Sequence, residues 1–337
     1  MESFINPNCH YLRVKTMVED NLKKMNEEKA HEGLINLIEN YGGENKELFK
    51  TYIQSLKEEA DKWKKDELTG LCSKGFMIHK LSEELKRSFR PPGGVEMPVG
   101  KRSPVSVGMF DVDEFKSIND ELGHLEGDKI LSKTAEHFLK TLKQAFGNLR
   151  AGDSVGKYVG RYGGDEIMLV LPGTYLADAL SVAERIRNNI SKQKDLHGIT
   201  ASGGLTSSDV VGIPLILGEL GRELTEIYVH EDGNMEKSEC LKKVFDNYTR
   251  KSGLSEDKVK YMLKNIRDFI IIKESNRNHD PITADFANFE EMAVELITHY
   301  VDKALYKAKE TGKNRIVVYS EEGFGSYDDQ GGWIRLE

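Results

Sequence analysis

The sequence has few cysteines and no long apolar run, and each scarcity excludes a class of protein. Its three cysteines, Cys9, Cys72 and Cys240, lie far apart and form no CxxC pair. Such a set supports neither a disulfide framework nor a zinc site. No stretch approaches the roughly 20 apolar residues that cross a bilayer, and the start MESFINPNCHYLRV lacks the features of a secretory signal. We therefore expect a cytoplasmic protein with no membrane partner.

An excess of positive charge is also missing. The net charge of −8 argues against a surface that follows a nucleic-acid polymer, because such binding requires Lys and Arg to neutralise phosphates. It leaves room for one small phosphate-binding pocket. With 38% hydrophobic and 31% charged residues, the 337-residue chain has the composition of a folded protein of two domains or one enlarged domain.

The N-terminal part, residues 10–65, predicts helices with a break at Gly42-Gly43. In the second helix, apolar residues at three- and four-residue steps share one face. They are Phe49, Tyr52, Ile53, Leu56, Ala60 and Trp63. This face either packs on the helix's own domain or pairs with its copy in a dimer, and the length is too short for periodicity to decide.

The rest of the chain alternates helical and strand-like patterns. Expected helices cover the stretch from Leu71 to about Phe89, then 129–146, 174–193, a segment after the capping Ser255, and 289 to Gly312. Expected strands cover 105–111, 155–162, 166–171, 198–205 and 315–319. The Gly-rich acidic stretch 321–337 predicts a loose tail.

The segment RYGGDEIMLVLP, residues 161–172, predicts a β-hairpin. Gly163-Gly164 suits a tight turn, and Asp165 and Glu166 then begin the returning strand. Because neighbouring strand residues point to opposite faces, only one of these acids can share a cation with a third acid in the simplest geometry. Taken alone, a solvated turn explains the segment equally well.

A second acidic segment changes this balance. Asp111 ends a predicted buried strand, Lys116 follows five residues later, and Asn119 and Asp128 come in the next turns. Blander interpretations make Asp111 a helix N-cap and Asn119 a local turn former. Two acidic segments, each at a strand end, favour a shared site instead.

Together these segments resemble the GGDEF family of diguanylate cyclases, with six motifs in the family's order between residues 66 and 319. They are Asp66-x-Leu-Thr-Gly-Leu71, Phe110-Asp-Val-Asp-x-Phe-Lys-x-Ile-Asn119-Asp, Gly123-His-x-x-Gly-Asp128, Arg161-Tyr-Gly-Gly-Asp-Glu166, Thr200-Ala-Ser-Gly203 and Asp302-Lys-Ala-Leu-Tyr-Lys-Ala-Lys-x-x-Gly-Lys-Asn314. The resemblance implies an α+β, polymerase-palm-like fold with a mostly antiparallel sheet flanked by helices. It also implies condensation of two GTP molecules into cyclic di-GMP with release of pyrophosphate.

The resemblance also assigns roles to residues. Asp111, the backbone carbonyl of Val112 and Asp165 would hold Mg²⁺ or Mn²⁺. Asp165 would also be the general base, and Glu166, the neighbouring acid, would be either a ligand or a second base. Asn119 and Asp128 would read guanine, with Phe115 and His124 beside them, although His124 suits a structural role equally well. Lys116, Lys309 and Lys313 would contact phosphates; Lys313 stands where the family usually has Arg, and so keeps the charge without the planar fork.

The resemblance implies a homodimer, since one palm binds one GTP, with residues 1–65 as the dimerisation or regulatory region and 66–320 as the catalytic domain. Two departures stand out. The usual Arg-x-x-Asp product-inhibition motif is displaced to Arg150 and Asp153, so we expect no inhibitory site. Residues of about 208–288 form an atypical insertion that could hold a regulator. Alternative functions are a catalytically silent receptor for GTP or cyclic di-GMP, and a palm that makes another cyclic nucleotide.

Overall fold

The structure is a computed structural model that describes residues 64–89, 103–146, 155–212, 255–275, 289–327 and 333–336. The helices expected in residues 10–63, and most of the insertion, lie outside these ranges. Within them, no helix is long and apolar enough to cross a membrane.

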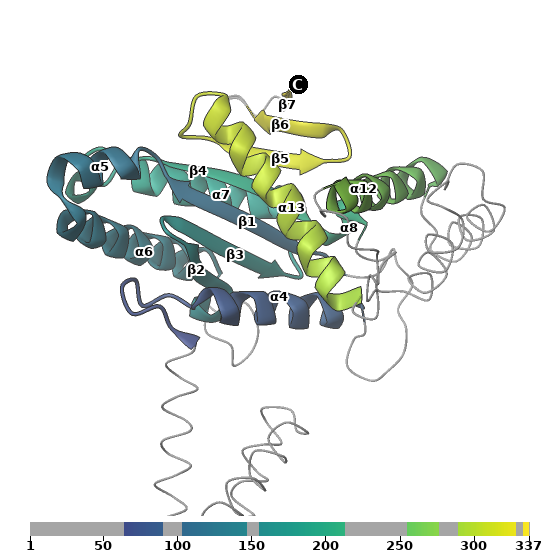
Figure 1. Cartoon of the computed structure of the whole chain (residues 1–337), viewed down its shortest axis with the longest axis horizontal. Coiled ribbons are helices and arrows are strands. Elements are labelled where there is room, and N and C mark those ends of the chain that lie inside the picture. Colours follow the sequence, from purple (N-terminus) through teal and green to yellow (C-terminus); the bar gives the residue numbers. More distant parts are fainter. Residues whose placement is uncertain are drawn as a thin grey trace, which may run out of the picture. The chain divides into compact units, whose positions relative to one another are not determined.

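A seven-stranded sheet in the order β2-β3-β1-β4-β5-β6-β7 forms the framework (Figure 1). Its strands are β1 Val105–Val112, β2 Val159–Gly163, β3 Glu166–Pro172, β4 Ala201–Ser207, β5 Ile316–Ser320, β6 Gly323–Tyr327 and β7 Trp333–Arg335. Neighbouring strands pair antiparallel except β4 and β5, which run parallel. This is the α+β fold with a mostly antiparallel sheet that the sequence predicts.

Helices cover both faces of the sheet. As a result β1 is buried along its whole length, and its side chains alternate between two apolar clusters, one on each face. Val107 and Met109 pack toward α4 (Lys74–Phe89) and α13 (Phe289–Glu310). Phe110 and Val112 pack toward α6 (His124–Phe146) and α7 (Leu176–Ser191). The short α5 (Phe115–Leu122) connects β1 to α6. Figure 1 shows α13 crossing in front of β1 and β4, with α7 behind them.

Helix α13 approaches β4 closely at one glycine. A Cβ atom at Gly204 would lie 2.3 Å from both the backbone nitrogen of Leu305 and the carbonyl oxygen of Val301. These are backbone atoms that cannot rotate away, so a side chain at position 204 would force α13 and β4 apart. This contact sets the spacing between α13 and β4.

One helix of the insertion is part of the core. Ser255 caps α12 (Glu256–Ser275) through a hydrogen bond from the backbone N–H of Lys258 to its hydroxyl oxygen, as expected from the sequence. Three apolar residues of α12 enter the same cluster as α13 and β1, together with the short α8 (Ser208–Val211). They are Val259, Met262 and Ile266.

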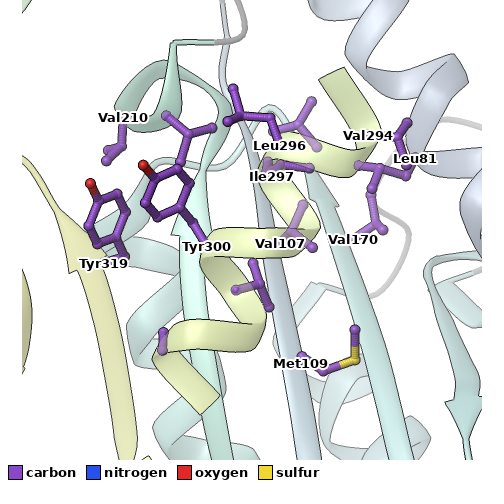
Figure 2. Packing of buried hydrophobic residues seen from close by; sticks show 14 of the residues in the cluster. Leu81, Val107, Met109, Val170, Val210, Val294, Leu296, Ile297, Tyr300 and Tyr319 are labelled. Atoms are coloured by element: carbon purple, nitrogen blue, oxygen red, sulfur yellow. The ribbon is translucent and has the colours of Figure 1, made fainter. Parts of the chain in front are cut away.

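A polar contact holds α12 in place within this cluster. Asn265 is buried; its side-chain oxygen accepts from the hydroxyl of Tyr319 at 2.8 Å, and its backbone carbonyl accepts from the hydroxyl of Tyr300 at 3.3 Å. The two tyrosine rings stack with centroids 4.3 Å apart, and Figure 2 shows them together near Val210. The insertion therefore contributes a satisfied buried side chain that joins α12 to α13 and β5.

The C-terminal stretch differs from the loose tail expected. Residues 323–327 and 333–335 form β6 and β7, which extend the sheet beyond β5. The ring of Phe324 lies 4.8 Å from that of Tyr319. The glycines and acids of this stretch indicated a loop, but its aromatic residues supply the apolar contact that strand pairing needs.

Candidate active site

The site is built around Asp111, near the end of β1. Its side chain is 9% exposed, and its backbone position pairs directly with Glu166 at the start of β3. Paired residues of antiparallel strands project to the same face of a sheet. Asp111 and Glu166 therefore share the face that α13 covers. Asp111 is not a helix N-cap, because α5 begins after Glu114.

The hairpin carries the third acid. Glu166 opens β3 as expected, whereas Asp165 lies in the turn itself, after Gly164 at φ 31°. Arg161 holds this turn: its Nε donates to the carbonyl of Gly164 at 2.8 Å, and its Nη1 lies 3.2 Å from the Asp66 carboxylate. The first and fourth of the six motifs are thus in direct contact.

The acids influence one another electrostatically. Burial raises the pKa of Asp111 to about 6; the hydrogen bond from Lys309 opposes this rise, and the charges of Asp165 and Glu166 add to it. Burial also raises the pKa of Glu166, and the charge of Asp302 on α13 raises it further. Three sequence-distant segments therefore bring negative charge to one place. Crowded carboxylates of this kind are typical of functional sites.

Two lysines offset part of this charge. Lys309 of α13 lies 2.6 Å from Asp111, between its Nζ and Oδ2. Lys74 of α4 stands over the ring of Tyr162, with its Nζ 4.1 Å from the centroid. Burial raises the pKa of Asp302, and the charge of Lys74 opposes this rise, as it also does at Glu166. The residues Lys74, Tyr162 and Asp302 were not among those the sequence singled out for the site.

The donor set suits a hard divalent cation. Asp111, Glu166, Asp165 and the carbonyl of Val112 offer only oxygen, the ligand atom that Mg²⁺ prefers. Among the residues that the structure describes, no three His, Cys, Asp or Glu side chains meet closely enough to form a ready-made cluster. A cation here would thus take part of its coordination from a ligand or water, as is usual for Mg²⁺.

The expected base-reading residues lie on the α5–α6 pair. Asn119 is half-buried on α5, Asp128 is exposed on α6, and Gly127, also on α6, is buried. A Cβ atom at Gly127 would lie 1.9 Å from the side-chain oxygen of Asn119. The glycine thus leaves the space that the Asn119 amide occupies. The contact between Gly127 and Asn119 shows this role, which the spacing of residues along the sequence does not indicate.

The other expected contacts fall nearby with mixed exposure. Phe115 is half-buried against the apolar cluster of α6 and α7, whereas Lys116 and His124 are exposed. Lys313 lies just beyond α13 and forms an ion pair with Glu114. The hydrogen bond between them raises the pKa of Lys313 and lowers that of Glu114. Arg150 and Asp153 lie outside the described residues.

The residues Asp113, Thr200, Ser202 and Asn314 form a contact that the sequence did not indicate. Asp113 is buried, and its carboxylate accepts from the hydroxyls of Thr200 and Ser202, each at 2.6 Å. It also accepts from the backbone N–H of Asn314 at 3.0 Å. Three of the six motifs therefore meet at one carboxylate. Pairwise spacing along the chain contains no signal for this contact.

The fold and the acidic strand ends define an α+β palm-like domain, and comparison with known proteins identifies its family. The family described as "Diguanylate cyclase, GGDEF domain" matches residues 63–243. That range covers more than half of the chain. The chain belongs to the GGDEF domain family. The fifth letter of the family signature is Ile167 here, which is buried in the core.

Curated relatives match between a third and a half of the chain. Diguanylate cyclase DgcP of Pseudomonas aeruginosa is 32% identical over 164 residues, 47% of this chain and 21% of that protein. Response regulator PleD of Caulobacter vibrioides is 40% identical over 126 residues, 37% of this chain and 23% of that protein. The matched segments thus span less than a quarter of these relatives' length.

Solved structures of the family resemble the chain more loosely. The coiled coil and GGDEF domain of DgcB from Caulobacter crescentus, in complex with c-di-GMP, has a TM-score of 0.44 at 17% identity, over 81% of this chain and 92% of that one. The active GGEEF domain of a diguanylate cyclase from Vibrio cholerae has a TM-score of 0.39 at 20% identity, over 74% and 97%. The family match ends before α13, although α13 supplies the lysine on Asp111.

Proposed function

We propose that this protein is a diguanylate cyclase, which condenses two GTP molecules into cyclic di-GMP and releases two pyrophosphates. The observation that carries the proposal is the pairing of Asp111 with Glu166 beside the Gly-Gly turn that bears Asp165. Family membership and the diguanylate cyclases among its relatives support it. A receptor that only binds nucleotide has no need for this complete acidic set.

The acids would hold Mg²⁺ or Mn²⁺ on the α13 face of the sheet. The strand register favours Asp111 and Glu166 as the ligand pair, with the Val112 carbonyl, since their side chains project to one face. Of the two roles that the resemblance leaves open for Glu166, ligand or second base, we therefore propose the ligand. Asp165, in the turn, would then take the proton from an incoming 3′-hydroxyl. The bound cation would neutralise charge that builds up on the α-phosphate.

The remaining side chains would select and orient GTP. Asn119 and Asp128 present an amide and a carboxylate, which match the donors of guanine's edge and leave adenine's edge unpaired. Phe115 and His124 would lie beside the base. Lys116, Lys309 and Lys313 would contact the triphosphate; Lys309 would exchange Asp111 for phosphate oxygens as the nucleotide binds.

Two protomers are needed because one domain of this kind holds one GTP, whereas the product contains two. We assign residues 1–65 to dimerisation or regulation and 66–320 to the catalytic domain, with an insertion at about 208–288 open to an unknown regulator. A fully active monomer, measured by light scattering at the assay concentration, would rule out this arrangement. We also expect weak inhibition by cyclic di-GMP, since no usual inhibitory motif stands before the hairpin.

Mass analysis of the products tests the proposal and its alternatives together. Purified protein is incubated with GTP, ATP or both, with Mg²⁺ or with a chelator. The proposal predicts cyclic di-GMP from GTP alone, with no product after chelation or in Asp165→Ala. Binding of GTP without turnover would favour a silent receptor. A different cyclic nucleotide would favour a palm with another specificity.

A further inference from the structure

A buried carboxylate two residues beyond Asp111 joins the acidic strand to the turn that carries Lys313. Asp113 is 5% exposed, and all its visible partners are donors: two hydroxyls of the β4 segment and the backbone N–H of Asn314. Its own backbone N–H donates to the carbonyl of Thr200 at 2.9 Å. A buried carboxylate with this many donors is satisfied and held in one orientation.

The turn that Asp113 contacts has an unfavourable backbone conformation. Lys313 and Asn314 have φ values of 60° and 43°, in the left-handed region that residues with a side chain seldom adopt. Such conformations persist where the surroundings hold them in place, and they occur often at ligand sites. The carboxylate of Asp113 supplies that restraint from the side of β1.

A second contact restrains the same turn from α7. Nη1 of Arg187 donates to the side-chain oxygen of Asn314 at 2.8 Å and to its carbonyl at 3.1 Å. The N–H of Asn314 points to Asp113 while its oxygen atoms face Arg187. Asn314 is therefore held between two charged side chains, and Lys313, the preceding residue, follows its position.

We propose that Asp113 is a positioning residue, which orients the Lys313 turn so that its ammonium group reaches the phosphates of GTP. This rests on the proposed function. Asp113 itself touches neither substrate nor cation; it acts through the backbone of Asn314. The proposal accounts for the meeting of the Phe-Asp-Val-Asp, Thr-Ala-Ser and Gly-Lys-Asn motifs at one carboxylate.

A double-mutant cycle on GTP turnover tests this role. Asp113→Asn keeps the size of the side chain but replaces the carboxylate, which accepts from three donors, with a neutral amide that has one acceptor oxygen. We expect it to raise the KM for GTP about tenfold with kcat changed by less than about threefold, as for loss of a binding contact. In the Lys313→Ala background, Asp113→Asn should raise the KM little further, because the two residues act as one unit. Asp178→Asn, an exposed acid on α7, is the control. Multiplying effects in the double variant would overturn the proposal.

Hydrogen exchange gives a reading that does not need activity. In Asp113→Asn the amide of Asn314 should exchange about tenfold faster than in the wild type, since its acceptor is weakened. Unchanged exchange of the Asn314 amide would contradict the proposal, whether or not the wild type is active. An inactive wild type would count only against the cyclase assignment. Should Asp113→Asn fail to fold, Thr200→Val removes one donor to the same carboxylate and should produce the same shifts on a smaller scale.

Discussion

The ionised side chain of Asp111 should lower the free energy of unfolding, and replacement of Asp111 by asparagine measures this effect. In the folded state the pKa of Asp111 is raised from 3.8 to about 6, mainly because the carboxylate is buried. That difference corresponds to ~3 kcal/mol of unfavourable free energy when the group is ionised. Since solvent reaches the strand end, we expect ~1–2 kcal/mol in practice. Asp111→Asn removes this charge and should therefore stabilise the fold while it abolishes turnover.

The pH dependence gives the sign of the effect. Between pH 4 and 6 the folded protein binds more protons at Asp111 than the unfolded chain, so the ionisation penalty grows as the pH rises through this window. Urea unfolding of both proteins should give equal free energies near pH 3.5. The variant should then gain the full ~1–2 kcal/mol above pH 7. Equal stability at every pH, or a variant that is weaker at pH 8, would refute the reasoning.

Three further substitutions test contacts elsewhere in the domain. Gly204→Ala should destabilise the protein by ~1–3 kcal/mol in thermal melts, because the new methyl group meets the backbone of α13 at Val301. Gly127→Ala should leave the melting temperature nearly unchanged but displace the flexible Asn119 side chain, which should lower the preference for GTP over ATP by about tenfold in kcat/KM. Asn265→Leu should cost ~1–3 kcal/mol in urea unfolding, because a buried tyrosine hydroxyl loses its acceptor. An Asn265→Leu variant as stable as the wild type would mean that α12 is not a fixed part of the core.

Local sequence patterns predicted most of the fold because each element satisfies its own signal. The apolar run of β1, the Gly-Gly hairpin between β2 and β3 and the capping Ser255 each specify structure within a few residues. The prediction of a loose tail was wrong because it, too, rested on a local pattern, in which glycines dominate. The strands β6 and β7 form through pairing with β5 and contact with Tyr319, and these partners come together only in the folded sheet.

The site divides along the same line. Asp111 stands out in the sequence because it ends an apolar strand, and Asp165 and Glu166 stand out because they follow the Gly-Gly pair of a hairpin. Asp302 and Lys74 look like ordinary helix-surface charges in the sequence, and only the packing of α13 and α4 on the sheet brings them near Glu166. The register between β1 and β3 pairs Asp111 directly with Glu166, and the periodicity of the sequence could not predict this pairing.

Uptake of Mn²⁺, followed by electron paramagnetic resonance in the presence of a non-hydrolysable GTP analogue, tests the central claim most directly. If acids from β1 and from the hairpin hold one cation, then Asp111→Asn and Glu166→Gln should each lose the nucleotide-dependent uptake of the wild type, while Asp178→Asn keeps it. Undiminished uptake in either site variant would contradict a cation shared between the two segments.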